Sequence, residues 1–309
     1  MLLRSALKSA LLAGSHDQDQ KPGAERQMKV LSRLTAAAAT ALFASAGSAF
    51  AGLGKPTPWQ LGLQDAASPV MADIIGFHTF VLWIITAITV FVLALLVIII
   101  LRFNARANPT PSRTTHNTPL EVIWTIVPVI ILVLIAIPSF RLLFTELDVP
   151  TPDLTIKATG KQWYWSYAYP DNGNFEFDSL IVAEKDLKAD QPRLLTVDNE
   201  MVVPVNKVVH VLVTGADVIH SFTVPSFGIK IDAVPGRIND TWFKATIQGT
   251  FHGQCSELCG KDHAFMPITV RVTDDKGFAA WAAQAKQKYA AGASAPPTTL
   301  AAVGPAAQQ

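Results

Sequence analysis

Charged residues are scarce in this chain. They make up 16% of its 309 residues, and 25 basic side chains nearly balance 24 acidic ones. The even balance gives no reason to expect a nucleic-acid partner. Half of the residues are hydrophobic, and this composition indicates a protein associated with a membrane.

Cysteine is rarer still, with two residues in the whole sequence. Cys255 and Cys259 are separated by three residues, so they cannot form the Cys-x-x-Cys-His motif that attaches haem. The paired spacing on each side of a zinc finger is missing as well. A disulfide between them would close a very short loop and add little stability. The pair therefore needs another use.

The residues around these cysteines form a soft set of donors. His263 and Met266 follow them closely, and His220 lies upstream. Thiolate and thioether sulfur favour copper, and imidazole suits it too. Cysteines at positions i and i+4 can bracket two ions with bridging sulfurs, which predicts a one-electron relay. A tetrahedral zinc site from His220, Cys255, Cys259 and His263 is the alternative, but it has no need of Met266.

Two long apolar runs predict a membrane hairpin. Residues 80–101 carry no charge and, as a helix, would span about 33 Å, enough for the hydrocarbon core. Residues 122–140 form the second run, in which Pro128 and Pro138 are tolerable for a packed membrane helix. The connector holds Arg102, Arg106 and Arg113 without an acid before Glu121, whereas acids follow the second span. The positive-inside rule places the connector in the cytoplasm and both mature termini outside.

The two ends of the chain are predicted to lie outside the folded part. Residues 28–51 resemble a secretory signal, with a basic start, an apolar centre and Ala49-Phe50-Ala51 as the cleavage site. We therefore expect residues 1–51 to be a leader cleaved after Ala51. Met28 is the expected start, and a long basic leader is the alternative. The Ala-, Pro- and Gln-rich residues 290–309 are expected to be disordered.

The region after the hairpin predicts a β domain. Short β-branched runs lie at 154–158, 208–213, 241–243 and 268–272, separated by Pro, Gly and Asp. They indicate an antiparallel β-sandwich or barrel, and 276–289 indicates a terminal helix. The expected fold class is thus a membrane-anchored α + β protein, with a two-helix hairpin in 52–145 and a β domain in 150–289.

The ordered motifs of the chain resemble one family closely. They run from about Trp59 to Trp281 and comprise Leu63-Gln64-Asp65-Ala66, Ile123-Trp124-Thr125-Ile126, Gly160-Lys161-Gln162-Trp163-Tyr164-Trp165, Asp232-Ala233-Val234-Pro235-Gly236-Arg237 and the cysteine segment 255–266. In this order they resemble subunit II of cytochrome c oxidase, the subunit that carries the dinuclear copper A centre.

The resemblance implies a cupredoxin-type domain, with the cysteine loop between its last strands and His220 on another loop. It implies that Cys255 and Cys259 bridge two copper ions and that His220 and His263 each complete one shell. Met266 would be a weak ligand, and Glu257 would supply its backbone carbonyl. The Glu257 side chain would also reach a magnesium ion shared with subunit I, as suits a hard carboxylate.

Further roles come from the same resemblance. Electrons would enter at Trp163 from cytochrome c, whereas Tyr164 and Trp165 would only pack. Glu121 would stand at the mouth of a proton path, or serve only as a helix-entry carboxylate. The acids expected to steer cytochrome c are Asp171, Glu176, Asp178 and Asp217. Lys161 and Ala168 depart from the family pattern near this surface.

The implied function is electron transfer from cytochrome c to haem in subunit I, where oxygen is reduced to water and protons are translocated. The expected partners are subunits I and III in a bacterial inner membrane, with the copper domain in the periplasm and no haem on this chain. A membrane-anchored copper-delivery or thiol-redox protein is the alternative, although it would not need the hairpin. We expect the remaining histidines to be interfacial or surface residues: His78, His116, His210 and His252.

Overall fold

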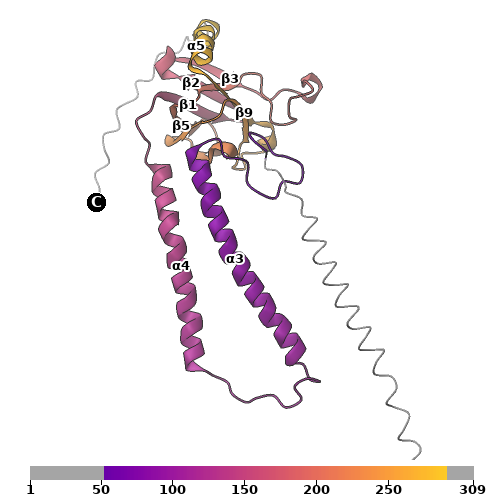
Figure 1. The fold of residues 1–309 in the computed structure, drawn as a ribbon. Helices are drawn as coiled ribbons and strands as arrows, with labels where there is room; N and C mark the ends of the chain where they lie inside the picture. Colours follow the sequence, from indigo (N-terminus) through magenta and orange to yellow (C-terminus); the bar gives the residue numbers. More distant parts are fainter. Residues whose placement is uncertain (1–51, 291–309) are drawn as a thin grey trace, which may run out of the picture. The chain divides into compact units, whose positions relative to one another are not determined.

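The computed structural model describes residues 52–290. The expected leader, 1–51, and all of the expected tail after Ala290 lie outside the described residues. Two long helices and a β domain make up the described part, and Figure 1 shows the helices running side by side from one end of the β domain.

The two helices contain the expected spans and extend beyond them. Helix α3 covers Pro69–Arg102 and α4 covers Thr118–Leu147. The side chains of Ser68 and Asn117 cap their first turns, and a proline follows each cap, where its missing N–H costs nothing. Both helices are long and apolar enough to cross a membrane, and most of their side chains are exposed. A bilayer or partner subunits must therefore cover them.

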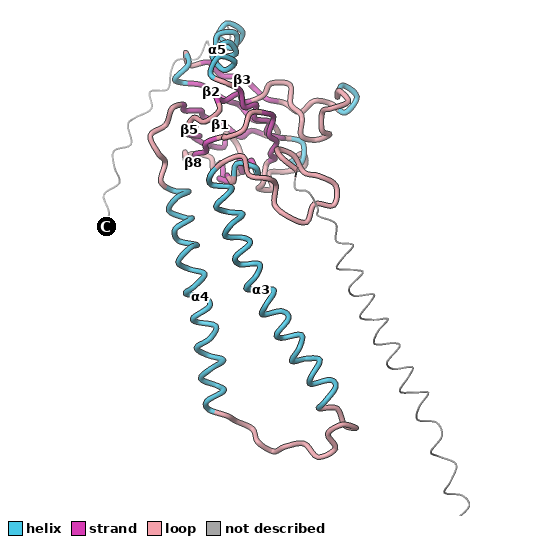
Figure 2. The backbone as a smooth tube through the Cα atoms, viewed as in Figure 1, coloured by secondary structure: helices cyan, strands magenta, loops and turns pink. Residues whose placement is uncertain are grey.

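Ten strands form three sheets in the β domain (Figure 2). The strands are β1 (Leu154–Lys161), β2 (Tyr164–Tyr169), β3 (Phe175–Ser179), β4 (Met201–Pro204), β5 (Val208–Gly215), β6 (His220–Val224), β7 (Ile229–Ala233), β8 (Asn239–Lys244), β9 (Gly249–Gln254) and β10 (Pro267–Thr273). The sheet orders are β3-β2-β1-β5-β8, β4-β10-β9 and β6-β7. Helix α5, Asp275–Ala290, closes the domain.

The four expected runs lie in β1, β5, β8 and β10, but the pairing is not purely antiparallel. Strand β1 pairs with β5 in parallel, and β4 pairs with β10 in parallel. Parallel neighbours need a long crossover. The chain supplies one between β1 and β5 by way of β2, β3 and β4. Such non-local pairing has no signature in a local run of residues.

The core lies between the sheets and beneath α5. Along β1 and β5 buried side chains alternate with partly exposed ones, as expected for strands with one covered face. Strand β2 supplies the fully buried Trp165, Tyr167 and Tyr169. Trp281 of α5 meets Tyr169 edge to face at a centroid distance of 5.0 Å. The expected terminal helix is therefore part of the core.

The β domain is fastened to the outer ends of both helices. The Ser68 hydroxyl, which caps α3, donates to the Phe227 carbonyl at 2.7 Å. Ahead of it, the Gly54 amide donates to Ser226 Oγ, and the Ala67 carbonyl accepts from the Thr246 amide. On α4, the Thr145 carbonyl accepts from the Trp242 indole. These bonds hold the β domain directly beyond the expected membrane boundary.

Candidate metal centre

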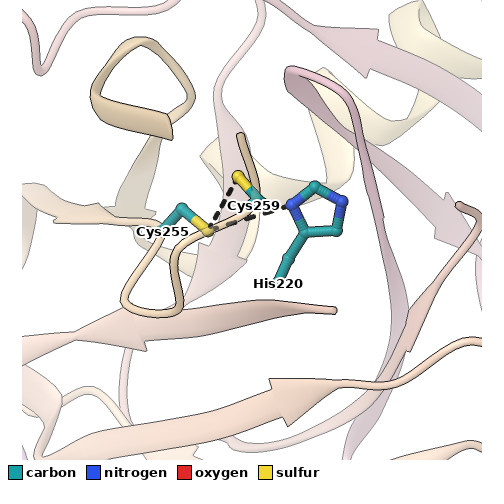
Figure 3. Close-up of side chains that lie close together, drawn as sticks. All are labelled: His220, Cys255 and Cys259. Atoms are coloured by element: carbon teal, nitrogen blue, oxygen red, sulfur yellow. Dashed lines mark hydrogen bonds between the residues drawn. The ribbon is translucent and has the colours of Figure 1, made fainter. Parts of the chain in front are cut away.

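The cysteine loop joins β9 to β10, as the resemblance implied. His220 differs slightly from expectation, because it is the first residue of β6 and not part of a loop. The Ser256 amide donates to the Ser221 carbonyl at 3.0 Å, which fixes the cysteine loop against the start of β6. In Figure 3 the two sulfurs and the nearer imidazole nitrogen point toward one another.

All of the predicted copper donors lie in one cluster. Cys255 Sγ is 3.9 Å from Cys259 Sγ and 3.9 Å from His220 Nδ1. Cys259 Sγ is 3.6 Å from His263 Nδ1 and 3.5 Å from Met266 Sδ. The Glu257 carbonyl oxygen lies 3.4 Å from Cys255 Sγ. The structure thus brings the six predicted donor groups together, and their role as copper ligands stays a prediction.

The donor set fits copper. Three sulfur atoms and two imidazoles converge in a pocket where both cysteines, His220 and Met266 are buried. A single tetrahedral zinc ion would use four donors and leave Met266 Sδ without a role beside Cys259. Both cysteines are free thiols, so both sulfurs are available as donors.

The two thiols differ in acidity. Burial alone would raise the pKa of Cys255, but hydrogen bonds from His220 and from the Ser221 amide outweigh it, and the pKa is lowered. Burial and the neighbouring Cys255 charge raise the pKa of Cys259. One thiolate therefore forms readily, and the second is expected to lose its proton only as a metal binds.

A polar network surrounds the donors. His220 Nε2 lies 2.8 Å from Asp217 Oδ1, and Asp217 Oδ2 accepts from the Gln162 amide at 2.7 Å. The Gln162 side chain donates to the Cys259 carbonyl at 2.9 Å. Trp165 Nε1 donates to the Met266 carbonyl. Sequence reasoning missed the role of Gln162, for which no local signal exists, and assigned Asp217 to another task.

Trp163 lies beside the cysteine loop. It is half-buried, and its Nε1 donates to the Cys259 carbonyl at 3.3 Å. Gly260 packs against the indole, since a Cβ there would come within 3.0 Å of Trp163 Cζ2. Lys261 Nζ lies 5.5 Å from the centre of the Trp163 ring. The Lys261 ammonium therefore lies over the Trp163 ring, where electrons are expected to enter, and the sequence pattern did not predict this contact.

The four expected docking acids are in different situations. Glu176 is exposed on β3. Asp171 accepts from the Thr155 amide at 2.8 Å, and Asp178 contacts the Ser166 hydroxyl and pairs with Lys161 at 3.5 Å. Asp217 contacts His220. Lys161, one of the departures from the family pattern, thus neutralises part of the expected acidic surface.

Two other acids lie away from the donor cluster or project from it. Glu121 Oε1 accepts from the Asn117 amide at 3.0 Å, which is a helix-capping contact. The Glu257 side chain is exposed on the cysteine loop. The proton-path role of Glu121 and the magnesium role of Glu257 stay predictions.

One expected surface histidine is buried. His252 Nδ1 lies 2.9 Å from the Leu195 carbonyl, and the side chain is 7% exposed, so the expectation was wrong. Its position on β9 faces the core side, which a single histidine in a short strand cannot signal.

Comparisons with known proteins identify the family. Residues 154–273 match the periplasmic domain of cytochrome c oxidase subunit II, and residues 56–142 match its transmembrane domain. The chain is 52% identical over 244 residues to the probable cytochrome c oxidase subunit 2 of Rickettsia bellii, covering 79% of this chain and 90% of that one. It is 44% identical over 252 residues to cytochrome c oxidase subunit 2 of Cereibacter sphaeroides, covering 76% and 83%.

A solved structure of the periplasmic domain of subunit II of cytochrome oxidase from Bradyrhizobium japonicum is 71% identical, with a TM-score of 0.44, and covers 46% of this chain and 99% of that one. From the family matches and the curated relatives, the chain belongs to the family of cytochrome c oxidase subunit II and is a membrane-anchored part of an oxidoreductase complex.

Proposed function

We propose that this chain is the electron-entry subunit of its oxidase, which receives electrons from cytochrome c at a dinuclear copper centre and passes them to haem in subunit I. Oxygen reduction to water and proton translocation follow in the partner. The observation that carries the proposal is the cluster of six donor groups, four of them on buried residues, with the Trp163 indole bonded to the carbonyl of one ligand residue.

Within this cluster we assign the ligand roles residue by residue. Cys255 and Cys259 would hold both ions, and His220 and His263 would complete one shell each, with Met266 and the Glu257 carbonyl as weaker ligands. When bound, two copper ions would share one electron, which would keep the reorganisation cost of electron transfer low. The start of β6 and the loop between β9 and β10 place the donors close together.

Trp163 is the proposed point of entry. Its indole is partly exposed, and its N–H reaches the Cys259 carbonyl, so a short bonded route leads from the surface to a ligand residue. Cytochrome c would dock around the indole. The acids expected to steer it are Asp171, Glu176, Asp178 and Asp217. The Lys161 and Lys261 side chains are expected to weaken that steering close to the indole.

Two acids have proposed roles at partner contacts. The exposed Glu257 carboxylate would bind magnesium together with groups of subunit I, because Mg²⁺ takes few ligands from any one chain. Glu121 would admit protons at the cytoplasmic end of α4.

The arginine-rich connector supports a bacterial inner-membrane orientation with the copper domain in the periplasm. Subunit III is a further proposed partner.

The main rival is a copper-delivery or thiol-redox protein, which would use the same pair of cysteines. Such a protein must release copper readily. In this chain the donors include the fully buried His220, at the start of β6, and the buried Met266, just before β10, so they come from separate parts of the fold. This arrangement favours a resident cofactor.

Metal analysis of the full chain in detergent tests the copper assignment. After copper loading we expect two ions per chain and a paramagnetic resonance signal from one electron shared by both. A Cys259→Ser variant is expected to lose the shared signal, because it removes one bridging sulfur. One copper per chain, or stoichiometric zinc in its place, would contradict the proposal.

A further inference from the structure

The Asp217 carboxylate lies at the surface, yet it accepts hydrogen bonds from several groups of the protein. Its Oδ1 lies 2.8 Å from His220 Nε2 and also accepts from the Val218 amide at 2.7 Å. Its Oδ2 accepts from the Gln162 amide at 2.7 Å. Three donors from two separate parts of the chain therefore converge on one side chain. The side chain is still 34% exposed, so these internal contacts add to whatever the carboxylate does at the surface.

The first arm of this contact sets the orientation of His220. An imidazole that donates its Nε2 proton to a carboxylate presents the lone pair of Nδ1, which here faces Cys255 Sγ at 3.9 Å. Carboxylates in this relation to a ligand histidine fix its ring and its tautomer. The ring itself is held tightly, because a Cβ at Gly160 would come within 2.9 Å of it.

The second arm reaches the turn that carries Trp163. The backbone amide of Gln162 bonds to Asp217, and the side-chain amide of the same residue donates to the Cys259 carbonyl at 2.9 Å. That carbonyl also accepts from Trp163 Nε1 at 3.3 Å. The start of β6, the 162–163 turn and the cysteine loop are thus joined in one ring of hydrogen bonds. Asp217 is the member that touches both the ligand histidine and the turn.

We infer that Asp217 is a positioning residue of the copper centre, which fixes Nδ1 of His220 as the metal-binding nitrogen and holds the Trp163 turn against the cysteine loop. This inference rests on the proposed function and gives Asp217 a positioning role in addition to the expected docking role. Asp217 would act on the metal through His220. Its substitution should therefore change the metal affinity and reduction potential of the copper centre.

The test compares full-length Asp217→Ala and Asp217→Asn with the wild type in detergent. Copper affinity is measured by competition with a chelator, and the reduction potential and paramagnetic resonance spectrum are recorded on the same samples. Loss of a group that orients a ligand typically weakens metal binding about 10- to 100-fold, and we expect this for Asp217→Ala. Asp217→Asn should fall between, because its amide oxygen can accept from His220 while its NH₂ faces the Gln162 amide.

Asp240→Asn is the matched control. Asp240 lies 3.3 Å from His210, so the same substitution alters an aspartate–histidine contact away from the donor cluster, and copper affinity and potential should stay at wild-type values. Circular dichroism of the metal-free variants confirms that each retains its fold. The near-isosteric Asn variant serves if the Ala variant fails that check.

Unchanged copper affinity and potential in the folded Asp217 variants would overturn the inference, whatever their kinetics with cytochrome c. Slower association that depends less on salt would then assign Asp217 to docking. If the wild type binds one copper or zinc, the proposed function fails, but the effect of Asp217 on the affinity for that metal is still measured.

Discussion

Beside the cysteine loop, the half-buried Trp163 side chain donates directly to the carbonyl of a predicted ligand residue, Cys259. Its neighbour Tyr164 lies on β2 beneath Lys161, with the ammonium 5.2 Å from the ring centre, and is not bonded to the loop. The two adjacent aromatic residues therefore have separable roles. One can be tested against the other at the same surface.

Trp163→Phe is expected to slow reduction of the copper centre by cytochrome c at least about tenfold, equal to ~1.4 kcal/mol of activation free energy. The phenyl ring loses the hydrogen bond to the Cys259 carbonyl. Stopped-flow reduction of the assembled oxidase measures the rate. The copper spectrum and the binding of cytochrome c should stay nearly intact, and Tyr164→Phe should retain the wild-type rate. A wild-type rate in Trp163→Phe would leave Trp163 as a packing residue.

His252 predicts a dependence of stability on pH. Burial lowers its pKa, and the contact with Leu195 opposes this only in part. Below the pKa of an exposed histidine, about 6.5, the unfolded chain binds a proton that the folded chain does not. The free energy of unfolding should therefore be highest above about pH 6.5. It should decrease as the pH is lowered further, by at most about 1.4 kcal/mol per pH unit for one proton.

Denaturant unfolding of the β domain within the full chain, from pH 5 to pH 7.5, measures this dependence. His252→Asn keeps a donor near the position of Nδ1 but removes the titration, so its stability should vary less over that range. Parallel pH profiles for the wild type and the variant would show that other groups cause the loss.

At the scale of the elements, close contact between β9 and β6 brings Cys255 and His220 together. Gly253 makes this contact possible, since a Cβ there would lie 1.8 Å from the Thr223 carbonyl oxygen. Farther along, the Ser256 amide donates to the Ser221 carbonyl, and these two residues directly follow Cys255 and His220. The spacing of these two strands therefore decides the geometry of the site.

Gly253→Ala should lower the free energy of unfolding by about 3 kcal/mol or more, because the backbone of β6 must move to admit the methyl group. Copper content should fall with it. Gly62→Ala is the control, because a Cβ there meets nothing within 4 Å, and its effect should stay within about 0.5 kcal/mol. Thermal unfolding and metal analysis of both variants provide the comparison. Equal melting temperatures would contradict the packing argument.

At the scale of the whole molecule, the proposed roles fall in two separate parts of the chain. Electron entry is proposed for the β domain, whereas Glu121 lies at the opposite end of α4 from the Trp242–Thr145 contact. Substitutions at the two ends of α4 should therefore affect different steps of turnover.

Glu121→Gln should leave copper content and copper reduction intact while steady-state turnover of the assembled enzyme falls by about tenfold or more, equal to ~1.4 kcal/mol. Glutamine can still accept from the Asn117 amide, so the helix start is preserved. Glu146→Gln, at the outer end of the same helix, is the matched control and should turn over normally. Oxygen consumption measures both. Normal turnover in Glu121→Gln would leave this residue as a helix cap.

Much of this protein was determined by the sequence alone. The hairpin follows from two uninterrupted apolar runs, because a bilayer imposes a minimum length that composition reports directly. The donor residues follow from local spacing in 255–266 together with the family motifs. The strands at 154–158, 208–213, 241–243 and 268–272 follow from β-branched runs between turn residues.

Only the tertiary structure decided how distant residues meet. The parallel pairing of β1 with β5 and the burial of His252 arise from contacts between segments far apart in the chain. Asp217 is exposed, as expected of a surface acid, yet its carboxylate also accepts from the backbone amide of Gln162, 55 residues away in the sequence. A local sequence pattern indicates whether a residue faces the core or the solvent. The hydrogen-bond partners of a polar group come from distant segments, and only the folded backbone brings those segments together.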